Sequence, residues 1–236
     1  MGGWSLFAAT YDPTGLLFPG PWSTFCTLFA EAPRWAPSAW KSYVAMIISL
    51  GLSLILALPL VFVMLISRGV QALVQACFVS LQCLPLFVLA PILVMCLGWS
   101  PATILIPSVL MVLYPITMAL WKGASAVPED YVFLFKSCSA SAWRTFLFLR
   151  VPFAAPQLFS GLRVGATTAG LAVVACEFAV GQSGLGMLIQ ESRRNFDLSM
   201  AFCSILLLGV EIASLYLLVV FLEWLLHPWR RHALMV

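Results

Sequence analysis

Few residues of this 236-residue chain have the types and spacing that chemistry requires. The cysteines form no C-x-x-C pair and no histidine stands at a metal-ligand spacing from them, so we expect no metal site. Two acids, Glu177 and Glu211, lie within or near apolar runs, where a carboxylate is costly to bury and is therefore a candidate for function. Glu177 precedes Gly181 by four residues, so a structural hydrogen bond in that turn and a substrate contact are both open.

Ser183 is a candidate nucleophile, because residues 181–184 read G-x-S-G. That pattern is similar to the loop of rhomboid-type intramembrane serine proteases, in which the serine needs a histidine beside it. The histidines here are His227 and His232. They follow the last apolar run, so His227 would lie roughly 30 Å from Ser183, across the bilayer core. We therefore expect no catalytic residue, and no cofactor, in this chain.

The amino-acid composition indicates whether this protein is surrounded by water or by lipid. Hydrophobic residues make up 62% of the chain, charged residues 9%, and the mean hydropathy is +1.03. A soluble domain carries roughly 25% charged residues, so a soluble monomer is excluded, and so is a disordered chain. The net charge of +3 is too small and too dispersed for a nucleic-acid-binding surface, so no nucleic-acid partner is expected.

Five apolar runs are long enough to cross a lipid bilayer, taking about 20 residues for each crossing. They cover residues 42–66, 72–97, 102–121, 157–180 and 199–226. The predicted fold class is therefore all-α, a polytopic membrane helical bundle of about five spans.

Residues 1–39 differ from the rest of the chain, which forms one transmembrane domain over about 40–230. This first segment holds five prolines and three tryptophans, a composition that predicts irregular backbone at the membrane surface. The segment either includes a re-entrant piece or follows an upstream span that is absent from the chain.

Lysine and arginine predict the orientation, because they gather on the cytoplasmic side. With five spans, one side receives eight of them: Arg68, Lys122, Lys136, Arg144, Arg150, Arg163, Arg230 and Arg231. The other side receives four: Arg34, Lys41, Arg193 and Arg194. We therefore expect the loop 122–156 and the C-terminus in the cytoplasm, and residues 1–39 outside.

The loop 122–156 is too charged to cross and has the pattern of two short amphipathic helices. Residues 130–138 form the first, residues 139–141 supply a break with a possible N-cap, and residues 142–150 form the second. Pro152 is expected to stop the second helix, because proline disfavours helix in the residue before it. Two such helices can lie on the lipid surface or insert into a groove on a cytoplasmic partner.

The order of these elements resembles the permease subunit of an ATP-binding cassette (ABC) importer that works with a substrate-binding protein. The cytoplasmic signature of that family is E-A-A, three residues, glycine, nine residues and I-x-L-P. Counting back from Pro152 places Leu149 at the isoleucine, Ser139 at the glycine and 133–135 at E-A-A. Further similar stretches are Leu81–Pro85, Ser160–Arg163, Cys176–Phe178 and Ser183–Gly186, so that the resemblance covers about 40–230.

Two departures from the signature affect what can be carried over. Phe-Leu-Phe replaces E-A-A, which removes the acid that would make a salt bridge to an ATPase. Ser139 replaces the glycine. If that position has a positive φ, serine there costs on the order of 1 kcal/mol.

The resemblance implies a division of labour. A separate ATPase subunit would hydrolyse ATP, since this chain has no G-x-x-x-x-G-K-[ST] sequence for the phosphates. That subunit would dock on the cytoplasmic helices, at Phe133, Leu134, Phe135, Lys136, Ser139, Trp143, Arg144 and Pro152. Two permease chains, expected as a homodimer in the cell membrane, would form the path, and an external binding protein would deliver the substrate.

The polar residues within or near the spans are candidates for contact with the substrate along the path. They are Ser80, Gln82, Glu177, Ser183 and Glu211. The resemblance of 157–200 is greatest to permeases for pyrimidine precursors of thiamine, with sulfonate, taurine and nitrate permeases nearby. An ion-coupled secondary transporter is the main alternative, although the chain shows no convincing internal repeat and few charges within its spans.

Overall fold

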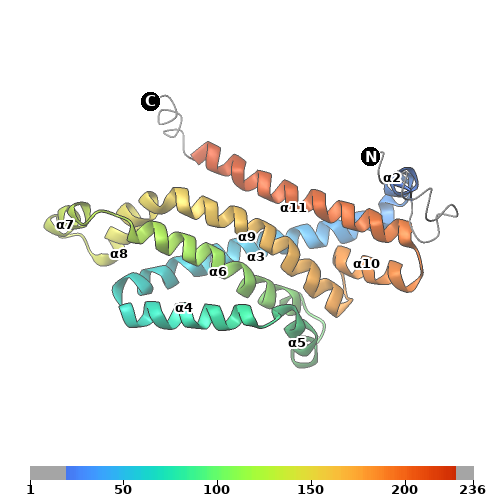
Figure 1. Ribbon diagram of the computed structural model, residues 1–236, viewed down its shortest axis with the longest axis horizontal. Coiled ribbons are helices and arrows are strands. Elements are labelled where there is room, and N and C mark those ends of the chain that lie inside the picture. The colour runs from blue at the N-terminus through green and yellow to red at the C-terminus, as the bar shows by residue number, and fades with distance from the viewer. Residues whose placement is uncertain (1–19, 227–236) are drawn as a thin grey trace. The chain divides into compact units, whose positions relative to one another are not determined.

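The structure is a computed structural model that describes residues 20–226, and within this range it is helical without a strand. The all-α prediction is confirmed. In chain order (Figure 1) the elements are α2 (Pro21–Ala30), α3 (Ala32–Ile66), α4 (Arg68–Cys83), the 3-10 turn η1 (Leu86–Val88), α5 (Leu89–Leu97), α6 (Ala102–Ser125), α7 (Glu129–Ser137), α8 (Ala142–Thr145), the π-helical turn η2 (Phe146–Arg150), α9 (Val151–Val180), α10 (Gly184–Arg194) and α11 (Leu198–Leu226).

Four helices are long and apolar enough to cross a membrane: α3, α6, the continuous helix Ala142–Val180 and α11. The fifth predicted span, 72–97, is not one straight helix. It consists of α4 and the segment Leu86–Leu97, which meet at an angle of 71° around Pro85. The expected count of about five spans therefore holds if this bent pair crosses the membrane.

The helices fold into two compact units. Among the described residues, the first unit contains 20–46, 87–108 and 170–213, and the second contains 47–86, 109–169 and 214–226. The chain passes from one unit to the other five times, once in each of the four long helices and once in the bent pair.

The N-terminal segment departs from its prediction. Residues 21–30 and 32–39 are helical rather than irregular, and α3 begins ten residues before the expected start of the first span. Pro21 occupies the first turn of α2 and Pro33 the first turn of α3, where a helix needs no N–H from the residue. The indole of Trp35 donates a hydrogen bond of 2.8 Å to the Leu28 carbonyl and ties the two helices together. Residues 1–19 lie outside the described part of the chain.

Pro152 does not end a helix, contrary to our expectation. The chain is helical from Ala142 to Val180, and the π-helical turn Phe146–Arg150 lies just before the proline. In that turn the Val151 N–H bonds the Phe146 carbonyl, five residues back. A π-helical turn shifts the backbone hydrogen-bond pattern by one residue. This shift accommodates the proline, which has no N–H to donate, so the helix continues past Pro152.

Close packing of α6 on α9 sets the core of the second unit. The buried residues there are Val61, Leu120, Ala124, Phe146 and Ala154. A Cβ atom added at Gly123 would lie 2.8 Å from the Cβ of Ala154, so only glycine allows the two helices to approach this closely.

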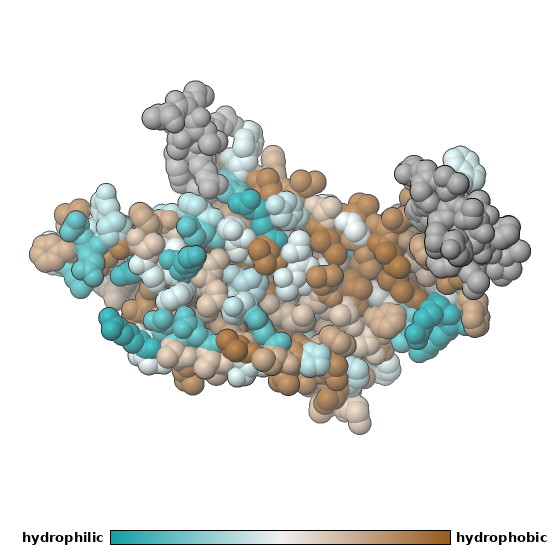
Figure 2. All heavy atoms as spheres, in the orientation of Figure 1, coloured by the Kyte–Doolittle hydropathy of each residue, from teal (hydrophilic) through white to brown (hydrophobic). Residues whose placement is uncertain are grey.

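The surface is largely apolar. Figure 2 shows hydrophobic residues over much of the visible face, and large exposed hydrophobic side chains occur along α3, α5 and α11. A surface of this kind is suited to lipid or to protein neighbours within a bilayer.

Candidate functional site

The coupling segment, defined as residues 129–150, lies in the second unit and contains the short helix α7 and the first turns of the continuous helix Ala142–Val180. The first of the two predicted short helices is confirmed, whereas the second is not a separate helix. Helix α7 carries Glu129 and Asp130 in its first turn and Lys136 in its last, charges that suit the helix dipole. The Ser141 hydroxyl accepts a hydrogen bond of 3.3 Å from the Arg144 N–H, which confirms the predicted N-cap.

Ser139 has a positive φ, at 57°, so the condition under which serine is unfavourable at this position is met. The Ala140 N–H bonds the Phe135 carbonyl at 3.0 Å and the Ser139 N–H bonds the Lys136 carbonyl at 2.9 Å. This pair of bonds is a Schellman motif, which ends α7 and turns the chain toward α8.

The coupling segment exposes apolar side chains. No residue of α7 is buried, and Phe133 and Leu134 are 73% and 57% exposed. Phe135 is half-buried, and Arg144, Lys136 and Ser139 are exposed. Pro152 is exposed as well, but it belongs to the continuous helix rather than to a turn.

Trp143 has a partner within the fold that the sequence did not reveal. Its ring packs edge-on against Phe62 of α3 with centroids 4.7 Å apart, and it contacts Phe146 at 5.5 Å. Trp143 is still 43% exposed. It therefore anchors α8 to the second unit, and only part of its surface is available to a partner.

The polar residues proposed for the path fall in different units. Ser80 and Gln82 belong to the second unit, whereas Glu177, Ser183 and Glu211 belong to the first. The exposed Ser80 hydroxyl donates to the Ala76 carbonyl of its own helix at 3.0 Å. Gln82 lines a cavity of about 350 Å³ together with Tyr114 and Thr168, and Glu211 is half-buried on α11.

Glu177 is the centre of a buried hydrogen-bond network, which we call the Glu177 network. Its carboxylate accepts from the Ser42 hydroxyl at 2.8 Å and from the Gly186 N–H at 3.0 Å. The Ser42 oxygen in turn accepts from the Leu185 N–H at 2.8 Å. The network thus satisfies the free N–H groups at the start of α10 and places a negative charge at that helix terminus. Of the two roles left open for Glu177, the structure shows the hydrogen-bonding one.

The same contacts explain the glycines of the Ser183–Gly186 sequence. A side chain at Gly184, whose φ is +86°, would overlap the Glu177 carboxylate. A Cβ atom at Gly186 would lie 2.6 Å from the Val174 carbonyl oxygen. Ser183 precedes α10 without making a side-chain capping bond. The glycines of this sequence therefore allow α10 to pack closely on α9. The histidines considered as the partner of Ser183 in a protease, His227 and His232, lie outside the described residues.

Helix α10 lies between the predicted spans 157–180 and 199–226 and was not itself predicted. Its buried residues Leu185, Leu188 and Ser192 recur at three- and four-residue spacing, which is a helical period that the sequence contained. The guanidinium of Arg34 in α3 forms ion pairs with Glu191 and Asp197, at 3.3 Å each. These three residues do not belong to the Glu177 network. Arg34, Glu31, Glu191 and Asp197 are called the Arg34 cluster below.

An apolar groove of about 450 Å³ lies between α9 and α11 in the first unit. Phe87 and Phe178 supply aromatic rings, and Gly170 and Gly209 supply bare backbone. No charged side chain lines it among the described residues. The guanidinium of Arg193 lies over the Phe178 ring at 5.6 Å, so one cation stands near the groove without lining it.

Two further features bear on possible chemistry. Arg163 of α9 forms an ion pair of 2.9 Å with Glu223 of α11, two residues that the sequence did not indicate as partners. Between residues 20 and 226, His, Cys, Asp and Glu form no group that could hold a metal ion.

Comparison with known proteins shows the family to which the sequence of this chain is similar. Residues 49–232 match the family described as the binding-protein-dependent transport system inner membrane component. A probable ABC transporter permease protein of Haemophilus influenzae is 28% identical over 95% of this chain and 90% of its own length. The formylaminopyrimidine transport permease protein of Halalkalibacterium halodurans is 29% identical over 78% of this chain and 74% of its own. The riboflavin transport system permease protein of Chloroflexus aurantiacus is 28% identical over 63% and 56%.

Proposed function

The chain belongs to the family of binding-protein-dependent transport system inner membrane components, and from this premise we propose that it imports a small, flat heteroaromatic solute. It is a permease subunit of an ABC importer and a multi-pass protein of the cell membrane. That membership sets aside the ion-coupled transporter and the intramembrane protease.

The apolar groove supports the proposed substrate class. Ligand sites are concave and mostly apolar, with volumes of roughly 300–1,000 Å³, and this groove fits that description. Phe87 and Phe178 supply aromatic surface for stacking, and the open space beside Gly209 leaves room for a flat ring. A nitrate or sulfonate would need cations or other donors in the lining, and the described residues place none there. Two of the relatives are named for heteroaromatic solutes, formylaminopyrimidine and riboflavin.

Filling the groove tests this proposal. A Cβ atom at Gly209 meets nothing within 4 Å, so the side chain of Gly209→Phe starts in open space and adds bulk to the groove. We expect uptake by the reconstituted transporter to fall about tenfold, because stacking and shape complementarity are lost together. Gly51→Phe is the matched control, since Gly51 also has open space around it and does not line the groove. Equal uptake by the two variants would contradict the proposal, and a panel of ligands tested for thermal stabilisation of the binding protein would identify the solute.

The proposed partner at the coupling segment is a separate ATPase subunit that hydrolyses ATP. The exposed apolar residues of α7 support this, because amphipathic helices dock by an apolar face in a groove. We propose Phe133, Leu134, Phe135 and Lys136 as contacts, with Ser139 setting the turn between the helices. Trp143, Arg144 and Pro152 are proposed as contacts at the edge of this surface.

Phe133→Asp is the sharpest test of the ATPase contact, because Phe133 is highly exposed and its loss leaves the fold intact. We expect about tenfold weaker association with the ATPase in co-purification, the effect of losing one apolar anchor. Phe196→Asp is the control, because Phe196 is 85% exposed but lies in the α10–α11 loop of the other unit. Trp143 is less suitable, since an aspartate there would also remove its packing on Phe62. Association of Phe133→Asp at wild-type strength would contradict the proposed contact.

The remaining partners are an external binding protein and a second permease chain. We propose that the binding protein docks on the face that carries α2 and α10, and that the second chain forms a homodimer. Gln82 and Glu211 stay candidates for the path, whereas Ser80, Glu177 and Ser183 are weaker candidates because of the contacts described above.

A further inference from the structure

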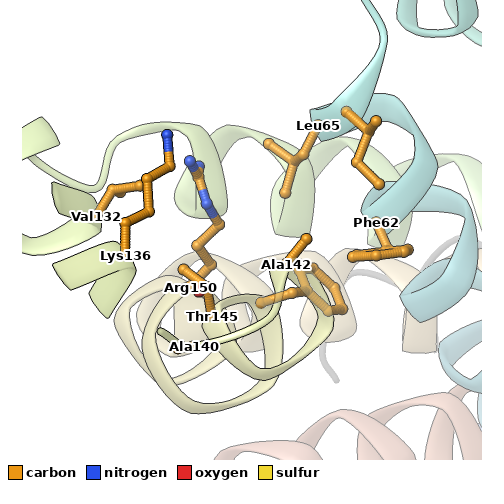
Figure 3. A pocket seen from close by; sticks show the side chains of 10 residues that line it. Phe62, Leu65, Val132, Lys136, Ala140, Ala142, Thr145 and Arg150 are labelled. Atoms are coloured by element: carbon orange, nitrogen blue, oxygen red, sulfur yellow. The ribbon is translucent and has the colours of Figure 1, made fainter. Parts of the chain in front are cut away.

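A cavity of about 310 Å³ in the second unit joins the coupling segment to the end of α3. Its lining divides into two kinds of surface (Figure 3). Lys136 of α7 and Arg150 of η2 extend on one wall, across from Phe62 and Leu65 of α3. Ile66, the last residue of α3, continues the apolar wall and is 63% exposed. The cavity is called the amphipathic cavity below.

Among the described residues, no acid lines the amphipathic cavity beside its two cations. Among residues 20–226, no carboxylate lies within 4.0 Å of Lys136 or Arg150. One guanidinium N–H of Arg150 donates to the Ala124 carbonyl at 2.7 Å, which fixes the direction of that side chain. Both cations also line a neighbouring cavity of about 380 Å³, where Glu129 is the one acid among the lining residues. Two cations that line one cavity, neither of them within 4.0 Å of a carboxylate, favour an anionic ligand there.

The position of the cavity indicates where the ligand comes from. Its apolar wall comes from the end of the membrane-spanning helix α3. Its cationic wall comes from α7, which lies between two spanning helices, and from the first turns of the helix Ala142–Val180. Lysine and arginine beside the cytoplasmic end of a span are where anionic lipid headgroups bind. A free phosphate would gain nothing from Phe62, Leu65 and Ile66, whereas the glycerol and first acyl carbons of a lipid would bury apolar surface there.

We propose that the amphipathic cavity binds an anionic phospholipid, with the phosphate between Lys136 and Arg150 and the upper acyl chain against α3. The bound lipid links the coupling segment to the membrane. The site requires only the permease chain, so it holds whether or not an ATPase docks on α7.

The test is lipid binding by the purified full-length permease in detergent, without an ATPase. Phosphatidylglycerol and phosphatidylcholine with identical acyl chains are titrated and followed by native mass spectrometry. We expect selective retention of phosphatidylglycerol, and about fivefold weaker retention by Lys136→Gln, as befits the loss of one cation near the phosphate. Lys122→Gln, which removes an exposed cation at the end of α6 outside the cavity, is the matched control and keeps wild-type retention. Lys136→Arg restores binding.

Three results would overturn the proposal. Equal retention of the two lipids would show that the cavity does not select a negative headgroup. An equal loss in Lys122→Gln and Lys136→Gln would show a general effect of net charge rather than a site. Competition by water-soluble glycerol phosphate as strong as that by phosphatidylglycerol would show that the ligand is a free phosphate.

Discussion

At the scale of single residues, Glu177 shows how a buried charge is used in this chain. The carboxylate lies within a membrane-spanning helix, but its two oxygens are bonded by the Ser42 hydroxyl and the Gly186 N–H. A buried charge is tolerated when hydrogen bonds surround it, and here they also cap α10. Glu177 therefore holds a helix in place, and its chemistry is that of an acceptor.

Glu177→Gln tests this role. Glutamine keeps one acceptor oxygen but points an NH₂ group toward donors and removes the charge from the start of α10. We expect a loss of about 1.5–3 kcal/mol of stability, the range for a hydrogen bond to a charged group, measured by thermal unfolding in detergent. Glu191→Gln is the matched control, because that acid belongs to the half-exposed Arg34 cluster and should cost about 0–1 kcal/mol. Equal losses in the two variants would contradict the capping role.

Single residues also show which features of the site could be predicted from the sequence and which could not. Glu177 could be selected because an acid in an apolar run is unusual. Its partner Ser42 could not, because a serine in a span carries no distinguishing signal and stands 135 positions away in the chain. The contact of Phe62 with Trp143 was hidden for the same reason, since it depends on how α3 meets the coupling segment.

At the scale of elements, the sequence predicted local backbone well where one residue type controls it. The turn at Ser139 and the cap at Ser141 both follow from local chemistry, and both are present. The stop at Pro152 was wrong because a π-helical turn upstream changed the hydrogen-bond register that the proline rule assumes. The bend at Pro85, the helical N-terminus and α10 likewise depend on packing that periodicity alone does not fix.

Because of the Schellman motif, we expect replacement of serine by glycine to change the stability in opposite directions at positions 139 and 137. Ser139→Gly should stabilise the protein by about 1 kcal/mol, because glycine adopts a positive φ without the Cβ clash. Ser137→Gly should destabilise it by a similar amount, about 1 kcal/mol, because Ser137 lies in the last turn of α7 where glycine is a poor helix former. Thermal unfolding of the two variants checks this. Shifts of the same sign would show that Ser139 is not strained.

At the scale of the whole molecule, the Arg34 cluster determines how many times the chain crosses the membrane. Arg34, near the start of α3, contacts Glu191 and Asp197, which flank the end of α10, so these residues lie on the same side of the bilayer. An even number of crossings must therefore separate Arg34 from Glu191. The helices α3, α6 and Ala142–Val180 supply three, and the bent pair of α4 and α5 must supply the fourth. With α11 the total is five.

Labelling of two native cysteines tests whether the chain crosses the membrane four or five times. Cys26 on α2 and Cys138 in the turn after α7 are both exposed. Three crossings separate them if the bent pair spans the membrane and two if it is a re-entrant loop, so five spans place them on opposite sides and four place them on one. We expect a membrane-impermeant maleimide applied to intact cells to label a variant that retains only Cys26, and to label one that retains only Cys138 after lysis alone. Labelling of both variants in intact cells, or of neither, would show that the bent pair turns back within the membrane and that the Arg34 cluster does not form there.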